Sequence, residues 1–163
     1  MYIGYFTIPF ILDFRYHKIN NMNIKIGTIA NYLAVVLLLG MGLIYLLKNS
    51  FMPYHSEAVS LEWNEVYFGT QFLILALMRA ISGGFIAIAI VIAFLQYKFY
   101  STKIKWLPII ILIGGLIVGL TSFYATMIIK FNTAGSPPTL SIIIGVLLLI
   151  IGYIFNKKYI DES

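Results

Sequence analysis

The segment Gln71–Gln96, QFLILALMRAISGGFIAIAIVIAFLQ, decides the fold class of this protein. It is long enough to cross a bilayer as one helix, since about 20 predominantly apolar residues suffice. It carries one full charge, Arg79, which lies about 12 Å from its start at a rise of about 1.5 Å per residue. Because an unpaired charge at this depth costs at least about 2.5 kcal/mol, the segment predicts a transmembrane helix in which Arg79 has polar partners.

Three further apolar runs accompany this segment. The chain is 61% hydrophobic and only 10% charged, whereas soluble domains carry roughly 25% charged residues. The four runs are Ile29–Leu47, Phe72–Leu95, Trp106–Ile129 and Leu140–Phe155. They predict an all-α, four-helix transmembrane bundle in one domain, residues 22–163, with the longest loop between the first two spans. The lipid bilayer is thus the first predicted partner.

Residues 1–21 stand apart from this domain. Met22 is followed by NIKIG and then by the first span, as in many bacterial membrane proteins. Residues 1–21 are therefore interpreted either as an upstream extension or as an interfacial anchor along the membrane. At the other end, the sequence NKKYIDES that begins at Asn156 is expected to be a solvated tail.

Basic residues predict the orientation. With the N-terminus inside, the outer loops hold only Lys48 and Lys130. The inner segments then hold Arg15, Lys18, Lys25, Lys98, Lys103, Lys105, Lys157 and Lys158. The positive-inside rule therefore places both termini in the cytoplasm, with the protein in the bacterial cytoplasmic membrane. The net charge of +5 follows from this asymmetry, so no nucleic-acid partner is expected.

Small and hydroxyl-bearing residues suggest surroundings for Arg79. Around it, two rows of small residues at four-residue spacing allow close approach of another helix; the rows are Ala76, Ala80 and Gly84, and Gly83 and Ala87. The third span is rich in hydroxyls near the same depth: Thr121, Ser122, Tyr124 and Thr126. We therefore expect Arg79 to point into the bundle, or into a wet cavity there, and to be held by hydroxyls and exposed carbonyls of this half of the third span. A counter-charge would have to come from the outer loop, from Glu57, Glu62 or Glu65.

The candidate ligand-binding residues are Arg79, Tyr124, Ser122, His55 and Glu57. His55 and the glutamates of the same loop have the chemistry for acid–base work. A zinc site is not expected, because the usual three ligands at recognisable spacing are absent. The chain has no cysteine, which excludes disulfides and thiol chemistry. No cofactor is predicted, and no catalytic residue is assigned.

Two sets of residues carry a resemblance. The run FMPYH (Phe51–His55) and the runs FYAT (Phe123–Thr126) and NTAGSPP (Asn132–Pro138) resemble small uncharacterised bacterial four-span membrane proteins. The general layout is also similar to DoxX-like small membrane proteins. The resemblance implies no reaction, but it implies that these outer-side motifs belong to one site.

Two functions remain open. The first is a non-catalytic membrane protein that packs as an oligomer or beside another membrane subunit. It requires Arg79 satisfied by protein atoms and an exposed face of small residues. The second is a binding protein or enzyme for a lipid or amphiphile, which requires an outward-facing cavity around Arg79 with His55 or a glutamate at its mouth. The first is favoured.

Overall fold

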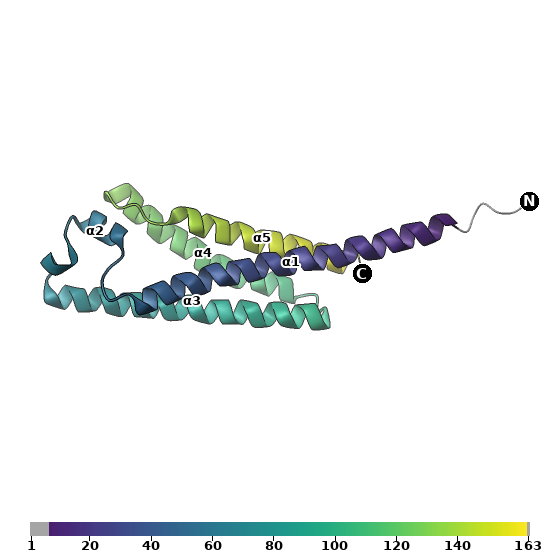
Figure 1. Ribbon diagram of the computed structural model, residues 1–163, viewed down its shortest axis with the longest axis horizontal. Coiled ribbons are helices and arrows are strands. Elements are labelled where there is room, and N and C mark those ends of the chain that lie inside the picture. Colours follow the sequence, from purple (N-terminus) through teal and green to yellow (C-terminus); the bar gives the residue numbers. More distant parts are fainter. Residues whose placement is uncertain (1–6, 163) are drawn as a thin grey trace, which may run out of the picture.

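The computed structural model describes residues 7–162, with side chains described from Met22 onward. Four long helices make up most of it: α1 (Thr7–Leu47), α3 (Phe68–Thr102), α4 (Leu107–Asn132) and α5 (Thr139–Asp161). They run along one long axis, and the N-terminal part of α1 extends past the others (Figure 1). All four are long and apolar enough to cross a membrane. The predicted all-helical class with four candidate spans is confirmed.

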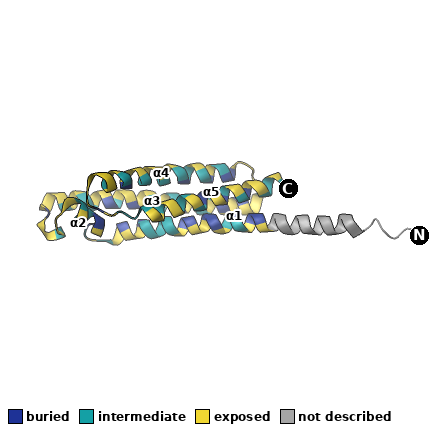
Figure 2. Cartoon of the chain, turned by 90° about the horizontal axis from the view of Figure 1, so that it is seen from above, coloured by how far each residue is buried: buried dark blue, intermediate teal, exposed yellow. Residues whose placement is uncertain are grey.

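The four helices form a ring in which neighbours are antiparallel. α1 packs against α3 and α5, and α4 packs closely on α5 and more sparsely on α3. The main apolar core takes residues from every helix: Ala34, Val35, Ala89, Ile92, Ile111 and Leu149. Exposed residues run along the outer side of each helix (Figure 2). Many of them are large and apolar, as expected for a surface that faces lipid.

The bundle has two different ends. The α2 end consists of residues 48–69 and 130–139, including the short helix α2 (Pro53–Val59) and the 3₁₀ turn η1 (Trp63–Glu65). The opposite end, which we call the lysine end, carries the α3–α4 turn and Lys98, Lys103, Lys105, Lys157 and Lys158. α3 ends at Thr102, and Lys103 after it is in the left-handed conformation, φ 57°. The prediction that the lysine end is cytoplasmic stays a prediction, as does the interpretation of residues 1–21.

Three amide side chains meet in the interior near the lysine end. Asn31 of α1, Gln96 of α3 and Asn156 of α5 are all fully buried. The Nδ2 atoms of Asn31 and Asn156 donate to Gln96 Oε1 at 2.7 and 2.9 Å, and Gln96 Nε2 donates to Thr28 Oγ1 at 2.9 Å. Because an amide without a partner is costly in an apolar interior, this network favours one arrangement of the three helices.

Each asparagine of the network fills the space over a glycine on the facing helix. A Cβ built on Gly27 would lie 2.3 Å from Asn156 Oδ1, and one on Gly152 would lie 2.0 Å from Asn31 Oδ1. α1 and α5 are antiparallel and both carry the spacing G-x-x-x-N, so the two motifs meet head to tail. The two Oδ1 atoms accept no hydrogen bond within the described residues, and a glycine Cα–H is the weak donor left to each of them.

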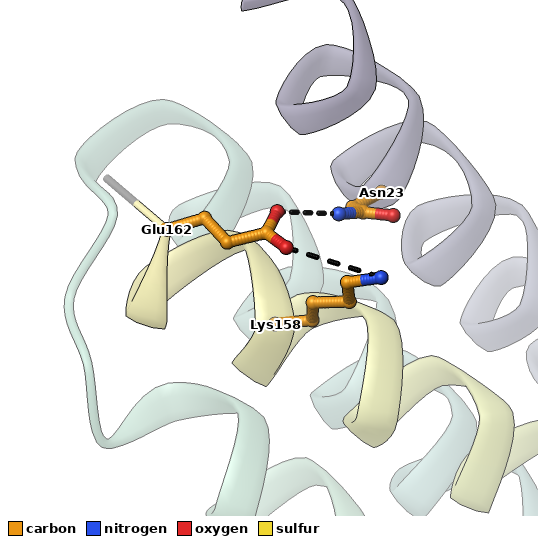
Figure 3. A network of polar contacts seen from close by, with 3 residues as sticks. All are labelled: Asn23, Lys158 and Glu162. Carbon is orange, nitrogen blue, oxygen red and sulfur yellow. Dashed lines mark hydrogen bonds and ion pairs between the residues drawn. The ribbon is translucent and has the colours of Figure 1, made fainter. Parts of the chain in front are cut away.

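The end of α5 is fastened to α1 as well. Asn23 Nδ2 donates to Glu162 Oε2 at 2.8 Å, and Lys158 Nζ lies 3.9 Å from Glu162 Oε1 (Figure 3). The expectation of a solvated tail from Asn156 is therefore wrong for Asn156, which is buried, whereas Lys157, Lys158 and Asp161 are exposed as expected. α5 continues to Asp161, and Gly27 leaves room for the Asn156 side chain inside the bundle.

Candidate functional site

Arg79 closes the C-terminal end of α1. Its Nη1 donates to the carbonyl of Tyr45 at 2.5 Å, and its Nη2 donates to the carbonyl of Lys48 at 2.8 Å and to Asn49 Oδ1 at 3.4 Å. The last carbonyls of a helix have no partner within the helix, and a cation there also complements the helix dipole. Among the described residues the charge is thus stabilised by two backbone carbonyls and one amide side chain, and by no carboxylate.

The expectation that hydroxyls of the third span hold Arg79 is wrong. Thr121 and Thr126 donate instead to carbonyls of their own helix, α4, at 2.7 and 2.8 Å. A hydroxyl in an apolar span satisfies itself locally at little cost, whereas α1 ends within reach of Arg79 and offers stronger acceptors. The two candidate ligand-binding residues on α4 are Ser122, which is half-buried, and Tyr124, which is 69% exposed. Neither is hydrogen-bonded to Arg79 in the described structure.

His55 lies in α2 with a role in the local fold. Its Nδ1 accepts the Met52 N–H at 3.3 Å, and its ring lies edge-on to Tyr54, with centroids 4.2 Å apart. Tyr54 is buried, and its hydroxyl contacts that of Tyr45 on α1. Burial lowers the pKa of His55 below 6.5, so the neutral imidazole that accepts this hydrogen bond predominates at pH 7.

Glu57 ties α2 to the α4–α5 loop. Its Oε2 accepts the Ser136 N–H at 2.8 Å. Gly135 also packs closely against α2, because a Cβ built on it would lie 2.7 Å from the carbonyl oxygen of Tyr54. The structure therefore brings together the FMPYH and NTAGSPP segments. The FYAT segment takes no part in this contact, and its Thr126 donates within α4.

A pocket of about 330 Å³ lies at the α2 end, and Arg79 does not line it. The residues that line it are Ser50, Phe51, Pro53, Ser56, Glu57, Glu62 and Trp63. Within the described part of the chain, no three His, Asp or Glu residues gather as metal ligands would. Of the five candidate residues, only Glu57 lines this pocket, and His55 lies two residues before it.

One side of α3 is exposed and lined with small residues. We call it the small-residue face: Ala76, Ala80, Gly83, Gly84 and Ala87. At 3.6 residues per turn it lies opposite Met78, Ser82 and Ala89, which are buried. A Cβ on Gly83 or Gly84 would meet no atom within 4 Å. The expected close approach of a helix at this face is therefore not made by any of the described residues.

Sequence reasoning missed the amide network. Asn31, Gln96 and Asn156 lie inside or at the edge of predicted spans, and polar residues at such positions are themselves a signal. The G-x-x-x-N spacing shared by α1 and α5 could have indicated that these two helices pair. Arg79 drew attention instead, because a full charge is the more costly group.

Comparison of the chain with protein-family models, with curated proteins and with solved structures gives no significant match. The resemblance to small bacterial four-span proteins therefore stays a prediction, and function is inferred from geometry.

Proposed function

We propose that this protein is a non-catalytic subunit of a membrane assembly, and that two copies associate through the small-residue face of α3. The proposal rests on one observation: a row of small residues lies exposed on the side of α3 opposite its buried residues. Many other exposed positions of the long helices carry large side chains, such as Ile117 and Leu120 on α4, which are 61% and 57% exposed. A flat, narrow strip lets two helix backbones approach closely in lipid.

The hydrogen-bond partners of Arg79 support the same proposal. Its hydrogen bonds in the described residues go to three neighbouring acceptors at the end of α1, and the pocket at the α2 end is lined by other residues. This is the arrangement of an arginine that joins two helices. The binding or enzymatic alternative needs Arg79 free to face a cavity.

A second copy fits the face because of symmetry. Two copies inserted with the same orientation present α3 in parallel and at the same depth. A two-fold axis along the membrane normal then brings Ala76, Ala80 and Gly84 of one copy against the same residues of the other. Such an interface is isologous and closes at the dimer.

Cysteine crosslinking in membranes tests the proposal, because the chain has no native cysteine. Ala80→Cys and Gly84→Cys are expected to give disulfide-linked dimers on mild oxidation. Ile117→Cys, on the exposed side of α4, is the matched control and is expected to give no disulfide-linked dimer.

A disruption experiment completes the test. Gly84→Leu is expected to convert the dimer to monomer in native mass spectrometry from detergent. Gly145→Leu is the control, since a Cβ on Gly145 also meets no atom within 4 Å but belongs to no such face. Monomers in every variant, including the unmodified chain, would refute self-association and leave a different membrane subunit as the partner.

A further inference from the structure

The pocket at the α2 end has a lining suited to one kind of ligand. Its walls include two carboxylates, Glu57 and Glu62, and no basic side chain. Ser136 N–H engages only one of the two Glu57 oxygens, which fixes the carboxylate in place and leaves the other oxygen for a ligand. The pocket therefore favours a cation over an anion.

Aromatic rings supply the second element. Phe51 and Trp63 both line the pocket, and their rings are nearly perpendicular, with an interplanar angle of 88° and centroids 4.9 Å apart. Phe51 is buried in this edge-to-face contact, 5% exposed, so the half-buried Trp63 is the more accessible of the two rings. The negative faces of such rings attract ammonium groups, and this attraction is greatest for organic cations that shed water easily.

The position and size of the pocket narrow the ligand further. Ser50 lines it and lies just beyond Leu47, the last residue of α1, so the pocket lies where an apolar span meets the head-group layer. A volume of about 330 Å³ is at the small end of the range for ligand sites. It is suited to a group of a few heavy atoms.

We propose that the pocket lined by Trp63, Glu57 and Glu62, with the buried Phe51 supporting Trp63, binds a small organic ammonium group of the choline or ethanolamine type. The Trp63 ring contacts its methyl or methylene groups, and the carboxylates neutralise its charge. The group comes either from a phospholipid head group or from a free amine, which share this chemistry. The site is independent of association through α3.

Tryptophan fluorescence provides a direct measurement. The chain has two tryptophans, so Trp106→Phe leaves Trp63 as the only reporter. The full chain in phosphatidylglycerol nanodiscs is titrated with choline chloride, with sodium chloride at equal concentration as the reference. A saturable change in Trp63 emission is expected with choline only.

Variants decide whether the proposed residues carry binding. Glu57→Gln with Glu62→Gln is expected to weaken choline binding at least tenfold. Glutamine at position 57 still accepts the Ser136 N–H, so the loop contact is kept. Glu65→Gln is the matched control, a nearby exposed glutamate that does not line the pocket, and it is expected to bind as the unmodified chain does.

The source of the amine is read from a second lipid composition. If phosphatidylcholine in the nanodisc competes with free choline, the natural occupant is a lipid head group. If choline binds equally in both lipids, it is a soluble amine. The absence of a saturable response in phosphatidylglycerol, or full binding by the double glutamine variant, would overturn the proposal.

Discussion

Two pairs of glycines in this bundle have opposite surroundings. Gly27 and Gly152 lie against asparagine side chains of the facing helix, and a Cβ at either would be 2.0–2.3 Å from an amide oxygen. Gly83 and Gly84 face open space. A glycine in a membrane helix thus indicates close approach, but the sequence around it does not tell whether the approaching group belongs to the same chain.

The largest expected effect is at the filled pair. Gly152→Ala places a methyl group on the Asn31 amide, which Gln96 holds in position. We expect the free energy of unfolding to fall by about 2 kcal/mol, as for overpacking of a tight core. Titration with sodium dodecyl sulfate in mixed micelles measures this change.

A double-mutant cycle tests the cause. Adding Asn31→Ala to Gly152→Ala removes the clash, so the two changes together should cost less than their sum. Simple additivity, or a Gly152→Ala protein as stable as the unmodified chain, would show that the Gly–Asn contact does not set the α1–α5 distance.

The next largest effect is expected at Arg79. Like Gly27 and Gly152 it contacts another helix of this chain, although it borders the exposed small-residue face of α3. Arg79→Gln loses the charge-assisted bonds to the Tyr45 and Lys48 carbonyls, and we expect a loss of about 1 kcal/mol in unfolding free energy. Arg79→Lys keeps the charge but not the planar fork. Its unfolding free energy should therefore lie between those of the unmodified chain and of Arg79→Gln. Dimer crosslinking through Ala80→Cys should persist in both variants, and its disappearance would link Arg79 to association.

A smaller effect, of opposite sign, is expected at the open pair. Gly83→Ala adds a methyl group that meets no atom of the described residues within 4 Å, and alanine is the better helix former by about 0.5–1 kcal/mol. The isolated monomer should therefore be slightly stabilised, while crosslinking through Ala80→Cys becomes weaker. Destabilisation of the monomer would mean that the face is covered by this chain after all.

The smallest effect lies at the α2 end and depends on pH. Because burial holds the pKa of folded His55 below 6.5, the unfolded chain binds a proton first as the pH falls. The stability of α2 should therefore decrease as the pH falls through 6.5 and level off below the folded pKa. Hydrogen exchange of the α2 amides at pH 7.5 and 5.5 measures this. His55→Gln should remove the dependence, and persistence of it would assign the titration to another group.

The sequence predicted the helices better than their partners. Apolar runs identify spans because backbone groups in lipid must be satisfied internally, and this argument needs no knowledge of neighbours. The partner of Arg79 was missed because the end of α1 and the hydroxyls of α4 are equally plausible by depth. α3 packs against both α1 and α4, so only the direction of the Arg79 side chain, toward the end of α1, decides between them.

The short helix α2 and the burial of Asn156 were not predicted from the sequence. α2 is too short to show a periodic signal, so the hydrogen bond of Glu57 with Ser136 was not predicted, although the resemblance implied that the FMPYH and NTAGSPP segments belong to one site. Asn156 follows the last apolar run and precedes two lysines, which is typical of a solvated end. It is buried because of a glycine on another helix.

The contact between Arg79 and the end of α1 has a consequence for biogenesis. The carbonyls of Tyr45 and Lys48 find this donor only after the chain has been synthesised beyond position 79. During insertion the first span therefore enters the lipid with an unfinished end, and the earliest self-sufficient intermediate is the hairpin of α1 and α3. The order of synthesis and the order of assembly are coupled through one side chain.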